Sequence, residues 1–164
     1  MIEVGDKLPS IPVKLVDTAG VTDADTLDIL GEGRVVLFGV PGAFTPTCDT
    51  AHLPGFVATA SKIRASGIDR IVCATVNDHH VTRAWAERSE ALGRVDFIAD
   101  PWAKFAEALG LAQDFPNLGG RRFVRFALIA RDGVVEKLFI QDVAGVTVSG
   151  AAAILLALQE EAVQ

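Results

Sequence analysis

Cys48 stands where a reactive cysteine is expected, after an apolar run and at the predicted start of a helix. The segment Val40–Cys48 reads VPGAFTPTC and follows the apolar run Val35–Phe38. The N–H groups of a first helical turn are unpaired and the helix dipole is positive there, so the thiolate form of a cysteine is favoured. Thr45 could bring a hydroxyl into the same space, and Pro41 could fix the incoming loop and cover the thiolate. These residues predict a nucleophilic thiol.

Strands and helices alternate around this segment. Short apolar runs between turn residues predict strands, and apolar spacings of three and four predict helices. Pro54 falls inside the first predicted helix and should kink it without ending it. Asn77 and Asp78 offer an N-cap for the second helix, and Ser149 offers one for the last. The expected strands are 11–16, 35–40, 71–76, 96–99, 123–130 and 134–140, and the expected helices are 47–64, 78–92, 101–109 and 151–158.

The order of these elements predicts an α/β fold. Alternating strands and helices, followed by a hairpin and a final helix, favour a mixed central β-sheet flanked by helices, parallel in the middle and antiparallel at one side. The turn Arg131-Asp132-Gly133 supplies a glycine where the hairpin needs a positive φ. This is the order of a thioredoxin-like fold, and we expect residues 1–164 to form a single domain of that kind.

Composition and charge exclude several classes of function. Half of the 164 residues are hydrophobic, the formal net charge is −6, and Lys and Arg are scattered along the chain, so nucleic acid is not an expected partner. Met1–Asp6 has neither a basic start nor a long apolar stretch, and no apolar run approaches the ~18 residues of a membrane span. We expect a cytoplasmic protein without membrane contact, whose two cysteines stay thiols unless one is catalytic.

The motif Pro41-x-x-x-Thr45-x-x-Cys48 resembles the signature of the peroxiredoxins. The longer match is similar to the atypical peroxiredoxin-5 or type II subfamily, which includes enzymes served by glutaredoxin or glutathione. The matching segments succeed one another in the right order over most of the chain. They are Val40–Cys48 (VPGAFTPTC), 52–56 (HLPGF), 71–78 (IVCATVND) and 121–127 (RRFVRFA).

The resemblance implies a thiol peroxidase for hydrogen peroxide and alkyl hydroperoxides. The Cys48 thiolate would attack the nearer peroxide oxygen, expel water or an alcohol and become a sulfenic acid. Thr45 would hold the peroxide oxygens, and Arg125 would stabilise the thiolate and the charge developing on oxygen. Pro41 completes the implied catalytic set. Glutathione, glutaredoxin or thioredoxin would supply electrons, and the resemblance implies a homodimer with Phe44 near its surface of contact.

Cys73 is the only possible internal partner for Cys48, because the segment 141–149, which carries a resolving cysteine in some relatives, has none. Cys73 lies inside the apolar run 71–76, and free cysteines are among the most buried residue types, so we interpret it as a packing residue. Joining it to Cys48 would require local unfolding of the helix start. The sequence therefore predicts one-cysteine chemistry, in which glutathione attacks the sulfenic acid and glutaredoxin or more glutathione releases the mixed disulfide.

Two other functions are open. A thioredoxin-type thiol–disulfide oxidoreductase would share the fold, but it uses Cys-x-x-Cys at this helix start, and Thr45 occupies the place of the first cysteine. A non-catalytic interaction domain would share the fold as well. The intact set of Pro41, Thr45, Cys48 and Arg125 argues against that second alternative.

His52 lies one helical turn after Cys48, so a Cys/His catalytic pair or half of a zinc site must be considered. A closed zinc site needs four ligands, and Cys73, His79 and His80 show no pairing at ligand spacing. We therefore expect neither a metal nor a cofactor. For His52 the expected use is a structural role in the kinked helix, or a minor polar contribution beside the pocket.

Overall fold

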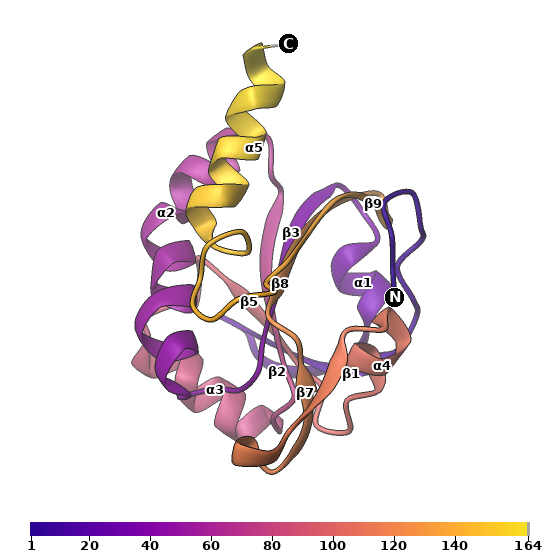
Figure 1. Cartoon of the computed structure of the whole chain (residues 1–164), viewed down its shortest axis with the longest axis vertical. Coiled ribbons are helices and arrows are strands. Elements are labelled where there is room, and N and C mark those ends of the chain that lie inside the picture. Colours follow the sequence, from indigo (N-terminus) through magenta and orange to yellow (C-terminus); the bar gives the residue numbers. More distant parts are fainter. Residues whose placement is uncertain (164) are drawn as a thin grey trace.

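The computed structural model describes residues 1–163, and a seven-stranded mixed sheet runs through its centre (Figure 1). The strand order is β2-β1-β5-β4-β3-β8-β9, with β3, β4 and β5 parallel and the outer strands antiparallel to their neighbours. Strands β6 and β7 form a separate antiparallel pair. The strands are β1 (Pro12–Asp17), β2 (Gly20–Asp25), β3 (Arg34–Val40), β4 (Arg70–Thr75), β5 (Asp96–Ala99), β6 (Ala112–Phe115), β7 (Gly120–Phe123), β8 (Phe126–Arg131) and β9 (Val134–Ile140). The helices are α1 (Thr26–Leu30), η1 (Cys48–His52), α2 (Leu53–Ala65), α3 (His79–Arg88), α4 (Lys104–Leu109), η2 (Pro116–Leu118) and α5 (Ala151–Val163).

Helices cover both faces of the sheet, because its central strands are apolar on both sides. Along β3, Val36 and Phe38 pack with the apolar residues of α2, α3 and α5, whereas Val35 and Leu37 pack with those of α1 and α4. This division results from the two-residue period of a strand. Figure 1 shows α2, α3 and α5 on one side of the sheet and α1 and α4 on the other. The predicted α/β fold, a mixed sheet flanked by helices, is confirmed. Antiparallel strands lie on both sides of the parallel centre, however, and not at one side as predicted.

The parallel strands end at one edge of the sheet, and that edge positions the predicted site. Strand β3 ends at Val40 and its parallel neighbour β4 ends at Thr75. The loop 41–47 leaves β3 at this edge and leads directly to Cys48. Ligands in sheets of this type commonly bind outside the carboxyl ends of the parallel strands. Cys48 therefore lies where the fold favours a binding site.

The helix that carries Cys48 has a wide turn close to its start. Cys48–His52 forms a π-helical turn, η1, in which the Leu53 N–H donates to the Cys48 carbonyl, and α2 continues without interruption. Pro54 comes immediately afterwards. In a regular α-helix a proline lacks one hydrogen bond and its ring meets the carbonyl four residues earlier, and a π turn is a common way to accommodate such a mismatch. The helix passes Pro54 as predicted, but the distortion is a π turn and not a simple kink.

Several elements, β2, α1 and β6 among them, were not predicted because they have little apolar pattern. Strand β2 reads GVTDAD and forms the edge of the main sheet, where exposed polar side chains are tolerated. Helix α1 is five residues long, and a reciprocal capping box between Asp25 and Asp28 fixes its start. Strand β6 pairs only with β7, outside the main sheet. Local capping and edge pairing, not periodicity, define these elements.

The strand predicted over 123–130 is interrupted near its start, and Arg125 lies in the break between β7 and β8. Phe123 ends β7 and Phe126 begins β8. Both phenylalanines are fully buried, so the apolar pattern gives no sign of the interruption. The backbone carbonyl of Arg125 accepts the N–H of Gln141, which ties the break to the end of β9 at 2.9 Å. Because Arg125 lies outside both strands, its side chain need not follow the alternation of side chains between the two faces of the sheet.

Helix α3 is shorter than predicted. It ends at Arg88 and not near residue 92, because Glu90 adopts a left-handed conformation with φ of 54°. Asp78 is the N-cap, and its carboxylate accepts the N–H of Val81 at 2.9 Å. Asn77, the other predicted cap, directs its side chain to the loop 41–47 instead.

The last two predicted helices also have different bounds. Helix α4 starts at Lys104, because Ala103 is left-handed with φ of 56°. Helix α5 extends to Val163, five residues beyond 158. The Ser149 hydroxyl donates to the side chain of Gln141 at 3.0 Å, an interaction that the capping prediction missed. None of the helices in residues 1–163 is long and apolar enough to cross a membrane.

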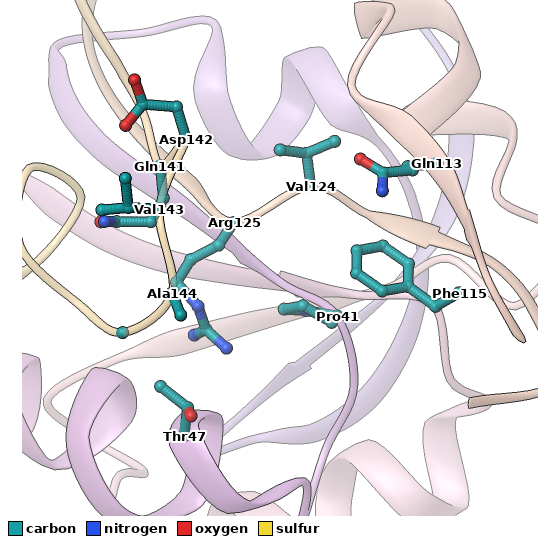
Figure 2. A pocket seen from close by; sticks show the side chains of 11 residues that line it. Pro41, Thr47, Gln113, Phe115, Val124, Arg125, Gln141, Asp142, Val143 and Ala144 are labelled. Atoms are coloured by element: carbon teal, nitrogen blue, oxygen red, sulfur yellow. The ribbon is translucent and has the colours of Figure 1, made fainter. Parts of the chain in front are cut away.

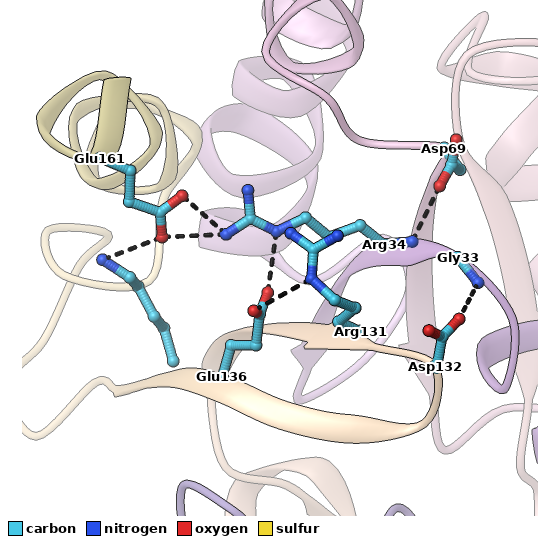
Figure 3. A network of polar contacts seen from close by, with 8 residues as sticks. Gly33, Arg34, Asp69, Arg131, Asp132, Glu136 and Glu161 are labelled. Atoms are coloured by element: carbon cyan, nitrogen blue, oxygen red, sulfur yellow. Dashed lines mark hydrogen bonds and ion pairs between the residues drawn. The ribbon is translucent and has the colours of Figure 1, made fainter. Parts of the chain in front are cut away.

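A buried arginine fastens α5 to the sheet (Figure 3). Arg34 is 9% exposed, and it donates to Glu136 on β9 (Nε to Oε1, 2.8 Å) and to Glu161 on α5 (Nη2 to Oε2, 2.7 Å). Lys137 also pairs with Glu161 (3.3 Å), and Arg131 pairs with Glu136 (3.2 Å). A buried charge requires such partners. Because α5 packs on α2, the network supports the helix that begins at the predicted nucleophile.

Candidate active site

Cys48 is fully buried at the first turn of its helix, and an arginine from a distant part of the chain reaches it. Its Sγ accepts a hydrogen bond from Arg125 Nη2 at 3.1 Å. A guanidinium next to the sulfur stabilises negative charge on it, and the positive end of the helix acts in the same direction. The structure therefore brings together two of the four predicted site residues.

Arg125 faces a cavity of about 370 Å³ (Figure 2). Pro41 and Thr47 line this cavity at the loop after β3, and Figure 2 shows the guanidinium directed into the space between them. Pro41 is buried. The other lining residues come from β6, the β7–β8 break and the segment after β9. They are Gln113, Phe115, Val124, Gln141, Asp142, Val143, Ala144 and Gly145. A small molecule in this cavity would meet the guanidinium that binds Cys48.

His52 links Arg125 to the segment that precedes α5. Its Nδ1 lies 2.8 Å from Arg125 Nη1, and its Nε2 lies 2.8 Å from the carbonyl oxygen of Ser149. A guanidinium can only donate and a carbonyl can only accept, so the ring must be neutral with its proton on Nε2. Burial lowers the pKa of His52 to about 4, which agrees with a neutral ring. The expected role for His52 was structural or minor, and the structure shows that it fixes one end of the Arg125 guanidinium.

Thr45 lies three residues before Cys48, and its backbone begins the helix. The Thr45 carbonyl accepts the N–H of Asp49 at 2.8 Å. Its hydroxyl donates to the carbonyl of Gly42 at 2.7 Å. Since the hydroxyl proton is engaged, its oxygen lone pairs are the part of Thr45 that can bind a ligand, as an acceptor from a peroxide O–H.

Asn77 supports the loop 41–47, and Arg122 joins two segments that lie near it. Asn77, just after β4, accepts the N–H of Ala43 at 2.9 Å. Arg122 donates to the carbonyls of Val76 (3.2 Å) and Leu118 (2.8 Å). The sequence suggested only capping for Asn77; its position directly after a parallel strand is the signal that could have indicated a role at this edge.

The outer side of the loop is held by α3. Asp49 accepts from Trp85 Nε1 at 2.9 Å and from Arg88 Nη2 at 3.2 Å. Arg88 also lies over the ring of Phe44, 5.3 Å from its centroid. Phe44 has a left-handed backbone with φ of 62° and is 39% exposed. The loop is therefore fixed on two sides, and it leaves one large apolar side chain partly uncovered.

Cys73 is fully buried in β4, within the same apolar layer as Cys48. Both cysteines are free. Burial, together with the neighbouring Cys48, raises the pKa of the Cys73 thiol well above its usual value, so Cys73 is a poor nucleophile at neutral pH. Among residues 1–163 there is no group of three or more His, Cys, Asp or Glu side chains placed to bind a metal ion. The rings of His79 and His80 lie next to one another at the start of α3, with centroids 4.0 Å apart and planes tilted by 38°.

Comparison with known proteins gives a consistent result. The family model described as Redoxin matches residues 3–155. Peroxiredoxin-2E-2, chloroplastic, of Oryza sativa is 44% identical over 164 residues, covering 96% of this chain and 72% of the relative. Peroxiredoxin-2C of the same organism is 41% identical, covering 96% and 98%. The structure of reduced Prx3 of Vibrio vulnificus in complex with H2O2 superposes with a TM-score of 0.93, is 38% identical and covers both chains completely.

Fold and site together define an oxidoreductase of the thioredoxin-like class, with a single cysteine at the helix start in place of a Cys-x-x-Cys pair. The chain belongs to the redoxin family and is a peroxiredoxin, a thiol-dependent peroxidase. The resemblance seen in the sequence is thus confirmed. Thioredoxin-type dithiol exchange lacks a second thiol at the site, because the other cysteine is buried in β4.

Proposed function

We propose that Cys48 is the peroxidatic cysteine and that it reduces hydrogen peroxide and alkyl hydroperoxides. The hydrogen bond from Arg125 Nη2 to Cys48 Sγ is the observation that carries this proposal. The thiolate attacks the nearer oxygen of the peroxide, the O–O bond breaks, and the leaving oxygen takes a proton and departs as water or an alcohol. Cys48 is left as a sulfenic acid.

Arg125, Thr45 and Pro41 have distinct parts in this step. Negative charge moves from sulfur to the leaving oxygen as the O–O bond breaks, and the Arg125 fork is already placed to stabilise it. The Thr45 oxygen accepts the peroxide O–H and so aligns the two oxygens with the sulfur. Pro41, buried beside the cavity, limits the access of water to the sulfur.

Replacing Thr45 by valine tests its part in this mechanism. Valine keeps the branched shape and removes the hydroxyl, so the rate constant of Cys48 oxidation should fall at least ~10-fold, the value of a hydrogen bond of about 1.4 kcal/mol. The rate is followed by stopped flow over a series of peroxide concentrations. Thr59→Val removes another helical hydroxyl, which donates to the Gly55 carbonyl, and serves as the matched control. Unchanged oxidation kinetics in Thr45→Val would assign Thr45 a structural role.

We propose further that an external thiol completes the cycle. Glutathione attacks the Cys48 sulfenic acid and releases water, and glutaredoxin or a second glutathione then attacks the mixed disulfide and restores the thiol. Two observations support this route. The sequence holds only two cysteines. Cys73 is buried and forms no disulfide, and the pKa of its thiol is raised.

Replacing Cys73 by serine should therefore retain most of the glutathione- or glutaredoxin-supported turnover. After one equivalent of peroxide and glutathione, intact mass should show one glutathione adduct, and peptide mapping should place it on Cys48. The thioredoxin system is compared side by side as the competing reductant. A stable Cys48–Cys73 disulfide in the wild type, together with lost turnover in Cys73→Ser, would refute one-cysteine chemistry.

We propose that the protein forms a homodimer and that it is located in the cytoplasm. A homodimer that buries the active-site loop would cover Phe44, which is 39% exposed, and the neighbouring Pro46. The proposed location is the cytoplasm, because two cysteines are too few for the disulfide framework that small secreted domains commonly carry.

A further inference from the structure

The Arg125 guanidinium belongs to a closed ring of hydrogen bonds. Arg125 Nη1 donates to His52, His52 Nε2 donates to the Ser149 carbonyl, the Ser149 hydroxyl and N–H donate to Gln141 Oε1, and the Gln141 N–H donates to the Arg125 carbonyl. The distances are 2.8, 2.8, 3.0, 3.4 and 2.9 Å in that order. The ring of hydrogen bonds thus starts at the Arg125 guanidinium and closes at the backbone carbonyl of the same residue.

Gln141 is the member of this ring whose side chain is most fully engaged. Besides Ser149, its Oε1 accepts the N–H of Thr147 at 3.0 Å, and its Nε2 donates to the Thr147 hydroxyl at 2.7 Å. Gln141 is 8% exposed and Ser149 is fully buried. With both ends of its amide occupied, the side chain has one orientation, and it binds the N–H and the hydroxyl of the residue whose carbonyl accepts from His52.

We propose that Gln141 is a positioning residue for the peroxide step: it sets the Ser149 carbonyl, which sets the His52 ring, which holds the Arg125 fork against Cys48. The proposal rests on the functions proposed for Cys48 and Arg125. Gln141 touches neither the sulfur nor the guanidinium with its side chain, so its influence must pass through Ser149 and His52.

The same residue also belongs to the cavity wall. Gln141 and the segment 142–145 line the cavity that Arg125 faces, and Figure 2 shows this segment on the side of the cavity opposite Gln113 and Phe115. The side-chain amide of Gln141 therefore anchors two parts of the site. One is the cavity wall that a substrate would contact, and the other is the guanidinium that would act on the substrate. A change in this amide should alter the alignment of Arg125 before it alters the overall fold.

Gln141→Met keeps the length of the side chain and removes its hydrogen bonds. We expect it to slow Cys48 oxidation by hydrogen peroxide about tenfold, the lower end of the loss seen when supporting partners at metal sites are removed. Gln141→Glu should restore most of the rate, because a carboxylate still accepts from Thr147 and Ser149 and the Thr147 hydroxyl can turn to donate. Gln159→Met, the same change at an exposed position of α5, should react like the wild type. Thermal unfolding of every variant is measured in parallel.

The decisive measurement repeats Gln141→Met in an Arg125→Met background. If Gln141 acts through the guanidinium, it should change the remaining oxidation rate less than about twofold there, while its effect on thermal unfolding persists. Equal slowing in both backgrounds would mean a merely structural role and would overturn the proposal, as would a wild-type rate in Gln141→Met alone. If Arg125→Met itself does not slow oxidation, the proposed function of Arg125 fails, and this inference fails with it. If Gln141→Met does not fold, Gln141→Asn is used instead, because its side chain is one methylene group shorter and its amide falls short of Thr147 and Ser149. It is compared in the same two backgrounds, with Arg125 and with Arg125→Met.

Discussion

Replacing Cys48 by serine is expected to abolish peroxide reduction while the fold is retained. The serine hydroxyl can still accept the hydrogen bond that Arg125 gives to sulfur, so the buried pair stays satisfied. A hydroxyl is far less acidic than a thiol, however, and it cannot form a sulfenic acid. Loss of added peroxide is measured with glutathione and glutaredoxin present, and circular dichroism reports the fold.

Cys73→Ser is the matched control, since it makes the same change at the other buried cysteine and should keep its activity. Substantial turnover by Cys48→Ser would mean that the reaction occurs elsewhere in the chain. Insulin reduction by the wild type, tested in the same series, would instead favour thioredoxin-type exchange.

Replacing Arg125 by lysine should slow Cys48 oxidation strongly even though the charge is kept. The guanidinium uses two nitrogens at once, Nη1 for His52 and Nη2 for Cys48, and a single ammonium cannot reproduce that planar fork. Loss of two hydrogen bonds of about 1.4 kcal/mol each corresponds to a rate lower by about 100-fold. Stopped-flow measurement of Cys48 oxidation under excess peroxide gives the rate constant directly.

Arg131→Lys makes the same change at the exposed end of β8, where the arginine pairs with Glu136, and it should leave the rate unchanged. A near wild-type rate in Arg125→Lys would remove the bidentate arginine from the mechanism. The positive charge near the sulfur would then be sufficient.

The parts of the site that are close in sequence could be predicted from it. Pro41, Thr45 and Cys48 lie within one loop and helix start, and the local physics of a helix N-terminus already indicates a reactive thiol. Arg125 was identified through resemblance to a family, since no local pattern connects it with a cysteine so distant in the chain. Its contact with Cys48 depends on the break between β7 and β8, which the apolar residues on both sides of Arg125 conceal.

The contacts between distant segments could not be predicted. His52 acquires its function from Ser149 and Arg125, which approach it from two other parts of the fold. Nothing near Gln141 in the sequence indicates that its amide will be enclosed by Thr147 and Ser149. The central strands and helices were predictable for the opposite reason, because their burial depends on periodicity within a single segment.

The π turn at Cys48–His52 sets the rotation between the two side chains that Arg125 contacts. It contains one residue more than an α-helical path needs, and each residue added to a helix rotates the next position by about 100° around the axis. Shortening this segment by one residue would give a uniform helix, but it would also turn His52 and Cys48 relative to one another and away from their shared arginine. Engineering for heat resistance commonly straightens and idealises such helices. In this chain the irregularity should be kept, because a more ideal backbone would separate Cys48 and His52 from Arg125 and so break up the active site proposed here.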